Sequence, residues 1–345
     1  MKIRNSEHEI GSDFEIRNSN LFRISIFGIR ILAFLFLANP AFAMGDVPSV
    51  TTTEVMNPTL TYVRSFGTPG SGERQFSYPR DVKTGNQQGG LDQLFVADTG
   101  NNRIEKLDAD GGFVSQFGGF GQGAGQFNTP DGIAVDLNYR IYVSEKDNDR
   151  VQQFDIRGNF LQSVASGELG MRALLEPAGL AVDNSGGLYI ADSGNNRIVR
   201  LGYFGDFYDE IGGFGTGPGF FNHPQGVAVD RDRTFYVADT GNSRVQKFDG
   251  DGHPLFAFGR YGSGPGDLNN PGAVAVDDKF VYVADTGNDR LCLFGKDGKF
   301  LLACGARGPG DGQFNAPLGI GLGGQGRVYV ADSGNHRIVE LKLGY

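Results

Sequence analysis

Val237-Ala238-Asp239-Thr240-Gly241-Asn242-Ser243-Arg244-Val245 is the clearest of several related stretches in this chain. Similar stretches stand at 96–104, 190–198, 283–291 and 330–338, and a divergent one runs from Val143 to Val151. Successive acids are separated by 47, 47, 47, 46 and 47 residues. A repeat of this length suits a four-stranded propeller blade better than a helical hairpin or a leucine-rich turn. The acids are Asp98, Glu145, Asp192, Asp239, Asp285 and Asp332.

Longer units surround these stretches. Each reads approximately P-x-G-I-A-V-D, then Y-V-A-D-x-G-N-x-R-I-x-x-F-D, then F-G, with good copies at Pro130 to Phe154 and Pro224 to Phe248. In this pattern the chain resembles the NHL repeats, from about Thr59 to Tyr345. The resemblance implies an all-β fold, a six-bladed β-propeller of four-stranded antiparallel blades. It says little about function, because propellers serve in binding, scaffolding and catalysis.

The two ends of the repeat region predict how the ring closes. Thr61 to Gly67 reads as a lone outermost strand d, whereas the last unit, Pro317 to Leu343, supplies only strands a, b and c, counted from the centre outward. We therefore expect the N-terminal strand d to join the C-terminal strands a–c in one blade. In the fourth unit we expect strands at about 226–230, 235–239, 244–249 and 255–259. Stacking such sheets radially buries faces that no single sheet could cover.

Loops of constant length join strand d of one blade to strand a of the next. Three residues before the proline that ends each loop stands a Phe or Leu. We expect this side chain to fill the gap between adjacent blades, where its burial is worth roughly 1.5–3 kcal/mol. The residues are Phe76, Phe127, Leu174, Phe221, Leu268 and Phe314.

The N-terminal segment is typical of a targeting sequence. Ile31 to Ala43 is a short apolar run that follows Arg23 and Arg30 and ends in the A-x-A cleavage pattern Ala41-Phe42-Ala43. The run is shorter than the ~20 apolar residues that span a bilayer.

These features predict three segments: a signal peptide at 1–43, a flexible linker at 44–58 and an NHL-repeat propeller at 59–345. The protein is then exported, to the periplasm or the medium, without stable membrane insertion after cleavage. An uncleaved N-terminal membrane anchor beginning near Leu21 is the alternative.

Charge and cysteine usage narrow the partners. The net charge is −9, and removing residues 1–43, with five positive and four negative charges, leaves −10. Nucleic-acid binding uses a basic face, so we expect no nucleic-acid partner. Cys292 and Cys304 lie on opposite arms of a hairpin and look diagonal, which favours two buried free thiols over a disulfide. Two cysteines also exclude a RING module.

Each repeat pairs its acid with an Asn three residues later and an Arg five residues later. Asn and Gly tolerate left-handed backbone, a carboxylate accepts turn amides, and Arg can fork onto that carboxylate or onto loop carbonyls. Six anion or metal sites are the alternative, but a catalytic centre is normally singular, so we interpret the set as a structural turn clamp. Its pairs are Asp98–Arg103, Glu145–Arg150, Asp192–Arg197, Asp239–Arg244, Asp285–Arg290 and Asp332–Arg337.

Function is then expected where the repeats differ. Blade 1 reads Arg80-Asp81-Val82-Lys83 where other blades mostly carry small residues at the second and fourth positions, and its a–b hairpin is longer. Blade 2 reads Ser144-Glu145-Lys146-Asp147 in place of A-D-T-G, and the loop at 167–176 loses most glycines. Because d–a loops and b–c turns share one face of a propeller, we expect a ligand site there. The alternative is that these loops have diverged in sequence because they lie in a part of the ring that binds nothing. The candidate ligand-binding residues are Arg80, Asp81, Lys83, Asp131, Glu145, Lys146, Asp147 and Gln225.

Catalytic patterns are weak. The propeller histidines stand on different blades or faces, so they cannot share one zinc as in the amidating lyases of similar fold. Carboxylates at the channel could supply oxygens to Ca²⁺, as in gluconolactonase-like propellers. Three d–a loops carry aromatic residues that would suit a protein or glycan surface if exposed, but we expect them to pack over the blade seams. They are Phe120, Phe214 and Tyr261.

The sequence thus predicts an exported, monomeric binding or scaffold module that takes a protein, peptide or glycan on its d–a/b–c face. We expect no catalytic residues, metal ligands or cofactor, with Ca²⁺ in the channel left open. The alternative is a metal-assisted lyase or lactonase with a carboxylate-rich site at the central channel.

Overall fold

The chain divides into two units, Met1–Val55 and Met56–Tyr345. In the first, strand β1 (Leu21–Ile26) pairs antiparallel with β2 (Ile29–Phe34). Among the described residues, no helix has the length and apolar character needed to cross a membrane. The computed structural model describes residues 21–26, 29–34, 57–86, 92–164 and 173–345.

Most of the predicted signal peptide and linker is not described by the structure. The cleavage motif at 41–43 and linker residues 44–56 lie outside the described residues. The division into signal peptide and linker therefore stays a prediction.

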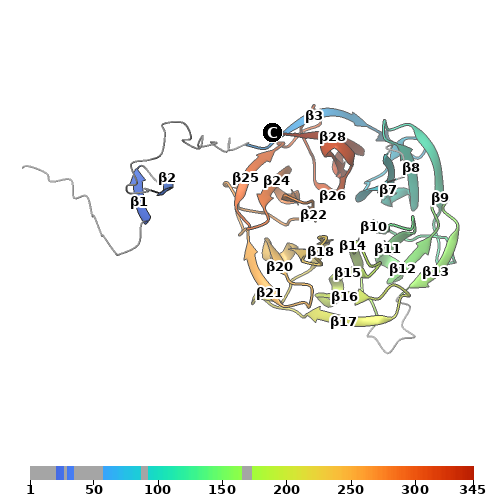
Figure 1. Cartoon of the computed structure of the whole chain (residues 1–345). Coiled ribbons are helices and arrows are strands. Elements are labelled where there is room, and N and C mark those ends of the chain that lie inside the picture. Colours follow the sequence, from blue (N-terminus) through green and yellow to red (C-terminus); the bar gives the residue numbers. More distant parts are fainter. Residues whose placement is uncertain (1–20, 27–28, 35–56, 87–91, 165–172) are drawn as a thin grey trace, which may run out of the picture. The chain divides into compact units, whose positions relative to one another are not determined.

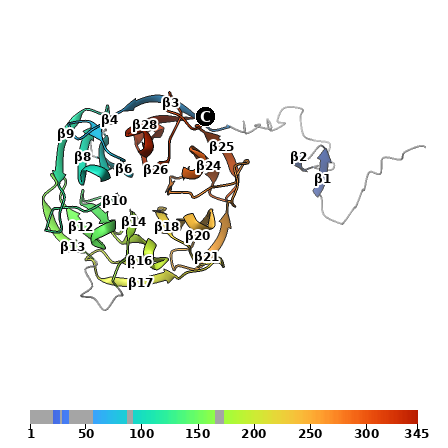
Figure 2. The ribbon, with the colours of Figure 1, turned by 180° about the vertical axis from the view of Figure 1, so that it is seen from behind.

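The second unit is a ring of six four-stranded antiparallel sheets (Figures 1 and 2). The predicted six-bladed propeller is confirmed, and the strands of blade 4 agree with the expected bounds to within two residues. Listed from strand a to strand d, blade 1 holds β6 (Asp81–Asn86), β7 (Asp92–Asp98), β8 (Arg103–Asp108) and β9 (Phe113–Gly118), and blade 2 holds β10 (Pro130–Val135), β11 (Ile141–Glu145), β12 (Arg150–Phe154) and β13 (Phe160–Val164). Blade 3 holds β14 (Pro177–Val182), β15 (Leu188–Asp192), β16 (Arg197–Leu201) and β17 (Phe207–Gly212), and blade 4 holds β18 (Pro224–Val229), β19 (Phe235–Asp239), β20 (Arg244–Phe248) and β21 (Pro254–Phe258). Blade 5 holds β22 (Ala273–Val276), β23 (Phe280–Asp285), β24 (Arg290–Gly295) and β25 (Phe300–Cys304), and blade 6 holds β26 (Pro317–Leu322), β27 (Arg327–Asp332), β28 (Arg337–Gly344) and β3 (Thr59–Phe66).

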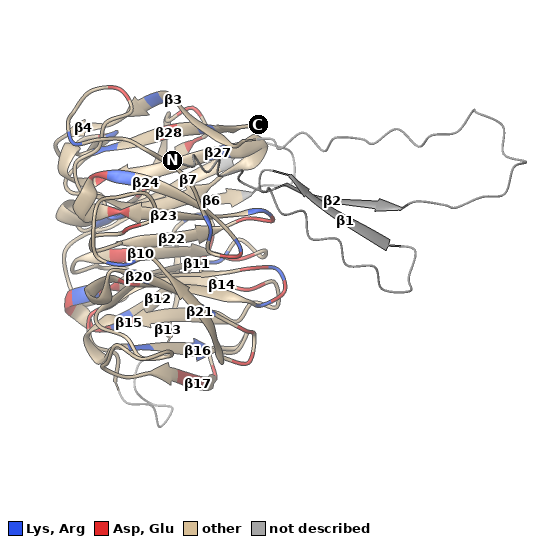
Figure 3. Cartoon of the chain, turned by 90° about the vertical axis from the view of Figure 1, so that its left-hand side faces the viewer, with Lys and Arg blue, Asp and Glu red and all other residues tan. Residues whose placement is uncertain are grey.

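Burial follows the position of each strand in its blade. Strand β19 is buried along its whole length, whereas β21, the outermost strand of the same blade, exposes all but its last residue. The inner strands read as continuous apolar runs because both of their faces meet another blade. Figure 3 views the ring edge-on, with the turns gathered along its two flat faces.

The N-terminal strand closes the ring, as predicted. Strand β3 pairs antiparallel with β28, with Phe66 opposite Ile338 and Thr59 opposite Gly344. Arg64 of β3 also donates through Nη2 to the carbonyl oxygen of Ala109 in blade 1, at 3.1 Å. Backbone pairing and a contact with the next blade therefore both hold the closing strand.

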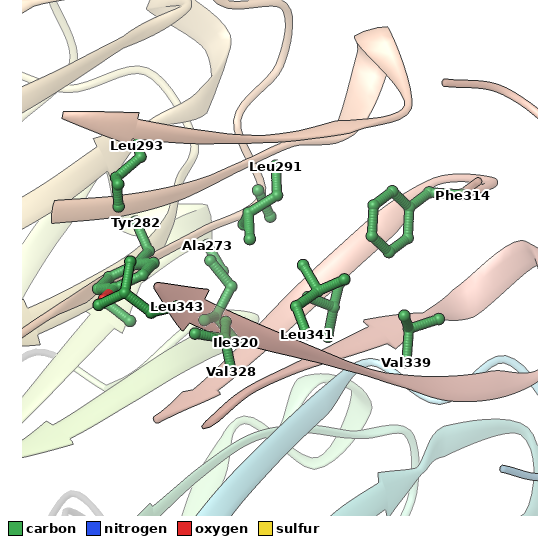
Figure 4. Packing of buried hydrophobic residues seen from close by; sticks show 13 residues of the cluster. Ala273, Tyr282, Leu291, Leu293, Phe314, Ile320, Val328, Val339, Leu341 and Leu343 are labelled. Carbon is green, nitrogen blue, oxygen red and sulfur yellow. The ribbon is translucent and has the colours of Figure 1, made fainter. Parts of the chain in front are cut away.

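Apolar side chains from both sheets fill each blade seam. Between blades 5 and 6, Leu291 and Leu293 belong to one cluster with Ile320 and Leu341 (Figure 4). The d–a loop adds Phe314, which is fully buried in this cluster. The prediction that loop residues fill the seams is thus confirmed, and the buried residues of this kind are Phe76, Phe127, Leu174, Phe221, Leu268 and Phe314.

A side-chain cap also links neighbouring blades. Asn102, at the end of a b–c turn, accepts through Oδ1 a hydrogen bond from the backbone N–H of Thr129 in the next blade, at 2.9 Å. At the closing seam His336 takes this place. Its Nδ1 accepts from the backbone N–H of Tyr78 at 3.1 Å, and the two rings lie 4.4 Å apart.

This cap gives a prediction for ring closure. His336 has a left-handed backbone, with φ of 56°. We expect His336→Ala to lower the free energy of unfolding by about 1–2 kcal/mol, because the cap is lost and alanine strains this backbone. His336→Asn should stay within about 0.5 kcal/mol of the parent, because Asn supplies an acceptor and tolerates this conformation. Urea unfolding measures both, and equal losses for the two variants would contradict the role of the cap.

The two cysteines are free thiols. Cys292 is buried in the cluster between blades 4 and 5, whereas Cys304 packs against the cluster between blades 5 and 6. Their side chains therefore occupy opposite faces of one sheet. Burial raises the pKa of the Cys292 thiol to about 12.

Candidate functional site

The repeated acid and arginine lock each b–c turn to the d–a loop before it. In blade 4, Asp239 is fully buried and accepts hydrogen bonds from Asn222 N at 2.8 Å and Arg244 Nε at 2.7 Å. Arg244 Nη2 donates onward to the carbonyl oxygens of Gly217, at 2.9 Å, and Phe220, at 3.0 Å. Arg244 Nε and Nη2 therefore both donate within the protein, which ties the turn to the loop.

The same geometry recurs around the ring. Burial raises the pKa of the Asp98 carboxyl, while hydrogen bonds from Ser77 N, Asn101 and Arg103 oppose that rise. The acid-to-Nε distances are 2.7 Å for Asp98–Arg103, 2.5 Å for Glu145–Arg150, 2.6 Å for Asp192–Arg197, and 2.7 Å for Asp239–Arg244, Asp285–Arg290 and Asp332–Arg337.

Glu145 lies within this clamp and is not among the residues that line the channel cavity. It is fully buried, and its carboxylate accepts from Arg150 Nε, from Asn148 Nδ2 at 2.6 Å and from Gln152 Nε2 at 2.7 Å. The sequence predicts both a clamp role and a ligand-binding role for Glu145. The structure does not bring it to the channel, because its partners hold it inside the turn.

The innermost strands surround a narrow central channel. They approach so closely that a Cβ on Gly132 would lie 2.4 Å from the carbonyl oxygen of Ala178, and one on Gly179 would lie 2.6 Å from that of Gln225. At the d–a/b–c end the channel holds a cavity of about 30 Å³. This space suits about two water molecules, so it admits a small group and not a sugar ring.

Three of the predicted residues meet at this mouth. Arg80 Nε lies 3.0 Å from Asp131 Oδ1, and Arg80 Nη2 donates to Gln225 Oε1 at 3.4 Å. The three come from blades 1, 2 and 4, so Arg80 reaches across the channel. The side chain of Asp131 is 10% exposed. Its buried Oδ2 has no hydrogen-bond partner within the described part of the chain.

Asp81 and Lys83 line the same cavity, but their polar groups join three blades. Asp81 Oδ2 accepts from Ile133 N of blade 2 at 2.9 Å. Lys83 Nζ donates to Asp81 Oδ1 at 2.8 Å and to the carbonyl oxygen of Ile320 in blade 6 at 2.9 Å. Burial raises the pKa of the Asp81 carboxyl, and Lys83 and the amide of Ile133 oppose this. This bracing role was not evident from the sequence.

Lys146 and Asp147 lie outside the channel cavity. Lys146 Nζ is 3.2 Å from Glu176 Oε2, and Thr129 Oγ1 donates to Asp147 Oδ2 at 2.5 Å. Both side chains therefore contact d–a loops. Two other segments in which the repeats differ lie mostly outside the described residues. They are the 167–176 loop, of which 167–172 are not described, and the longer a–b hairpin of blade 1, of which 87–91 are not described.

The d–a loops expose aromatic rings, which corrects our expectation that these rings pack over the seams. Phe120, Phe214 and Tyr261 are 74%, 75% and 77% exposed. Each forms a single parallel bridge with the buried residue seven positions later, such as Phe120 with Phe127, yet its own ring remains exposed. Tyr78 and Phe220, which the sequence did not single out, are exposed in the same set of loops.

The channel carboxylates do not fit a Ca²⁺ site well. Among the described residues, no group of three His, Cys, Asp or Glu side chains is arranged to hold a metal ion. Asp131 already forms an ion pair with Arg80, and Asp81 already forms an ion pair with Lys83. A calcium ion takes six to eight oxygens, roughly, and these cations would repel it.

Comparisons with known proteins agree with the repeat pattern. The NHL repeat family model matches residues 174–201, 221–248 and 314–341. The RING finger protein nhl-1 of Caenorhabditis elegans is 39% identical over 69 residues, which are 20% of this chain and 7% of that protein. The chain therefore matches only a small part of that relative's length.

Solved structures share the fold. Virginiamycin B lyase from Staphylococcus aureus aligns with a TM-score of 0.55 and 14% identity, covering 83% of this chain and 100% of that one. A gluconolactonase from Xanthomonas campestris aligns with a TM-score of 0.54 and 17% identity, covering 78% of this chain and 88% of that one. At such identities the likeness concerns the fold alone. The chain thus carries NHL repeats within a six-bladed β-propeller.

Proposed function

We propose that this propeller is a binding module that docks a protein on its d–a/b–c face. The observation that carries the proposal is the set of exposed aromatic rings on this face. They are spread over several seams, which suits a broad partner surface, and aromatic residues are enriched in protein interfaces. They are Tyr78, Phe120, Phe214, Phe220 and Tyr261.

The channel mouth supplies a polar anchor at the centre of this face. The side chains of Arg80 and Asp131 are 25% and 10% exposed, and the cavity beside them is about 30 Å³. Asp131 Oδ2 can accept one hydrogen bond from a donor on the partner, such as an amide or ammonium group. The exposed aromatic rings would supply contact area, and this single acceptor would fix the orientation of the partner.

The N-terminal apolar run with its A-x-A pattern supports export of the module, and we include export in the proposal. In that compartment the partner would be an envelope or extracellular protein.

Site-specific photocrosslinking tests the docking face. A benzoylphenylalanine placed singly at Phe120, Phe214 or Tyr261, in cells that make the protein, should capture one and the same protein from all three sites. Leu137 is the matched control, because it is 73% exposed but lies in an a–b turn on the opposite face. Capture of that protein equally from Leu137, or no capture from any of the three sites, would overturn the proposal.

A further inference from the structure

The c–d turn of blade 3 departs from the turns of blades 1, 2 and 4. In blade 2 the turn begins with Asp155, whose Oδ1 accepts from Arg157 N at 2.8 Å and Asn159 N at 2.9 Å. Blade 3 has Gly202 at this position, followed by Tyr203 and Phe204. Phe204 is 85% exposed. A self-capping polar turn is thus replaced by a glycine and two aromatic residues.

Strand d of the same blade contributes a third aromatic residue. Asp209 pairs with Arg200 and Phe207 pairs with Leu201, so Tyr208 is the extra residue of a β-bulge and is exposed. Every blade has a bulge at this place, and only blade 3 fills it with an aromatic residue. The others carry Val63, Val114, Leu161, Leu255 and Leu301.

These residues line an open cavity on the a–b/c–d face. Its volume is about 290 Å³, close to the lower end of the ~300–1,000 Å³ typical of small-molecule sites. Gly202 is part of the lining, and the Asp206 carboxylate occupies the place of its missing side chain, since a Cβ there would lie 2.7 Å from Asp206 Oδ1. The lining combines three tyrosines with polar groups from two a–b turns: Tyr189, Tyr203, Tyr208, Asp183, Ser185 and Arg233.

The rings are held before any ligand arrives. The guanidinium of Arg140 lies 4.3 Å from the centre of the Tyr203 ring. Gly186 allows that ring to approach, since a Cβ there would be 2.5 Å from it. The guanidinium of Arg200 lies 5.0 Å from the Tyr208 ring. Fixed aromatic walls reduce the entropy lost on binding.

The charges in and beside the cavity are balanced. Arg200 Nε donates to Asp209 Oδ1 at 2.6 Å, and its Nη1 donates to the carbonyl oxygen of Gly250 at 2.7 Å. It is therefore not available for an anion. The rim adds one acid, Asp183, and one base, Arg233. The cavity thus offers donors and acceptors without a net charge.

We propose that this cavity binds a neutral pyranose unit of a glycan. The C–H face of a pyranose packs on an aromatic ring, and its hydroxyl groups both donate and accept hydrogen bonds. Tyr208 and Tyr203 supply the rings, Asp183 supplies an acceptor, and Arg233 supplies a donor. The site lies on the face opposite to the protein-docking surface, so neither proposal depends on the other.

Calorimetric titration of the full chain tests this site. The probes are cellotriose, maltotriose and chitotriose, each raised to ~10 mM, where a millimolar Kd is still measurable. At least one should bind, and Tyr208→Leu should weaken that binding at least about tenfold, equivalent to ~1.4 kcal/mol. This variant restores the aliphatic character of the other bulges, so we expect it to fold. Leu255→Ala, at the equivalent bulge of blade 4, should leave the Kd unchanged.

Three results would overturn the proposal. One is the absence of binding by all three sugars. Another is equal binding by the parent and the Tyr208→Leu variant while thermal unfolding shows both to be folded. The third is tighter binding of a sulfated or uronic-acid trisaccharide than of any neutral one, which would assign the cavity to an anion.

Discussion

Replacing Asp239 by alanine is expected to lower the free energy of unfolding by about 3–5 kcal/mol, as for other buried ion pairs that lose one partner. The carboxylate is fully buried and accepts from Asn222 N and Arg244 Nε. Its removal leaves the Arg244 guanidinium, 16% exposed, without a counter-charge. The d–a loop before the turn also loses its attachment. Urea unfolding followed by circular dichroism measures the change.

A conservative variant at the same position and a control at an exposed position help to interpret this result. Asp239→Asn keeps the size and one acceptor oxygen, so we expect a smaller loss of about 1–3 kcal/mol even if the alanine variant does not fold. Asp251→Ala, at an exposed position in the same blade, should change the stability by no more than about 0.5 kcal/mol. If Asp239→Ala cost no more than Asp251→Ala, the acid would not be part of the scaffold.

Gly118→Ala is expected to destabilise the protein by about 3 kcal/mol or more, from backbone strain of ~1–3 kcal/mol and overpacking of ~1–3 kcal/mol. Gly118 has φ of 102°, and a Cβ there would lie 2.3 Å from the ring of Phe127. That ring is fully buried in the seam between blades 1 and 2, so it cannot move aside without opening the seam.

The neighbouring glycine separates the two causes. Gly119 also has positive φ, at 141°, but a Cβ there would meet no atom within 4 Å. Gly119→Ala should therefore show only the backbone part, about 1–3 kcal/mol. The difference between the two variants in thermal or urea unfolding measures the seam contact. Equal losses would show that Phe127 yields at no cost.

The fold was predictable from the sequence because each repeat reports the same structure independently. Six acids at nearly constant spacing, with Phe or Leu before each proline, define both the blade and its packing residue. Ring closure followed from simple counting, since Thr61 to Gly67 supplies the strand that the last unit lacks. The repeats predict the blade and its packing residue reliably, because a misread pattern in one repeat is outweighed by the agreement of the other five.

The site was only partly predictable from the sequence. Comparing the repeats shows which residues differ between blades, but not whether those residues bind a ligand or stabilise the fold. Arg80, Asp131 and Gln225 do meet at the channel mouth. Asp81 and Lys83, in contrast, brace neighbouring blades. Residue type alone does not distinguish a loop ring that packs, such as Phe127, from one that projects into solvent, such as Phe120. The turn at Tyr203 and Phe204 was visible as a departure, but only the structure shows that it joins Tyr208 at one cavity.

We propose that the repeated residues hold the ring together, whereas the exposed aromatic residues of the d–a loops bind a partner protein. Photocrosslinking from Phe214 tests it most directly, with Leu137 as the control of matched exposure on the opposite face. We predict capture of a single protein from Phe214, repeated from Phe120 and Tyr261, and none of that protein from Leu137. Capture that does not distinguish Phe214 from Leu137 would contradict the claim.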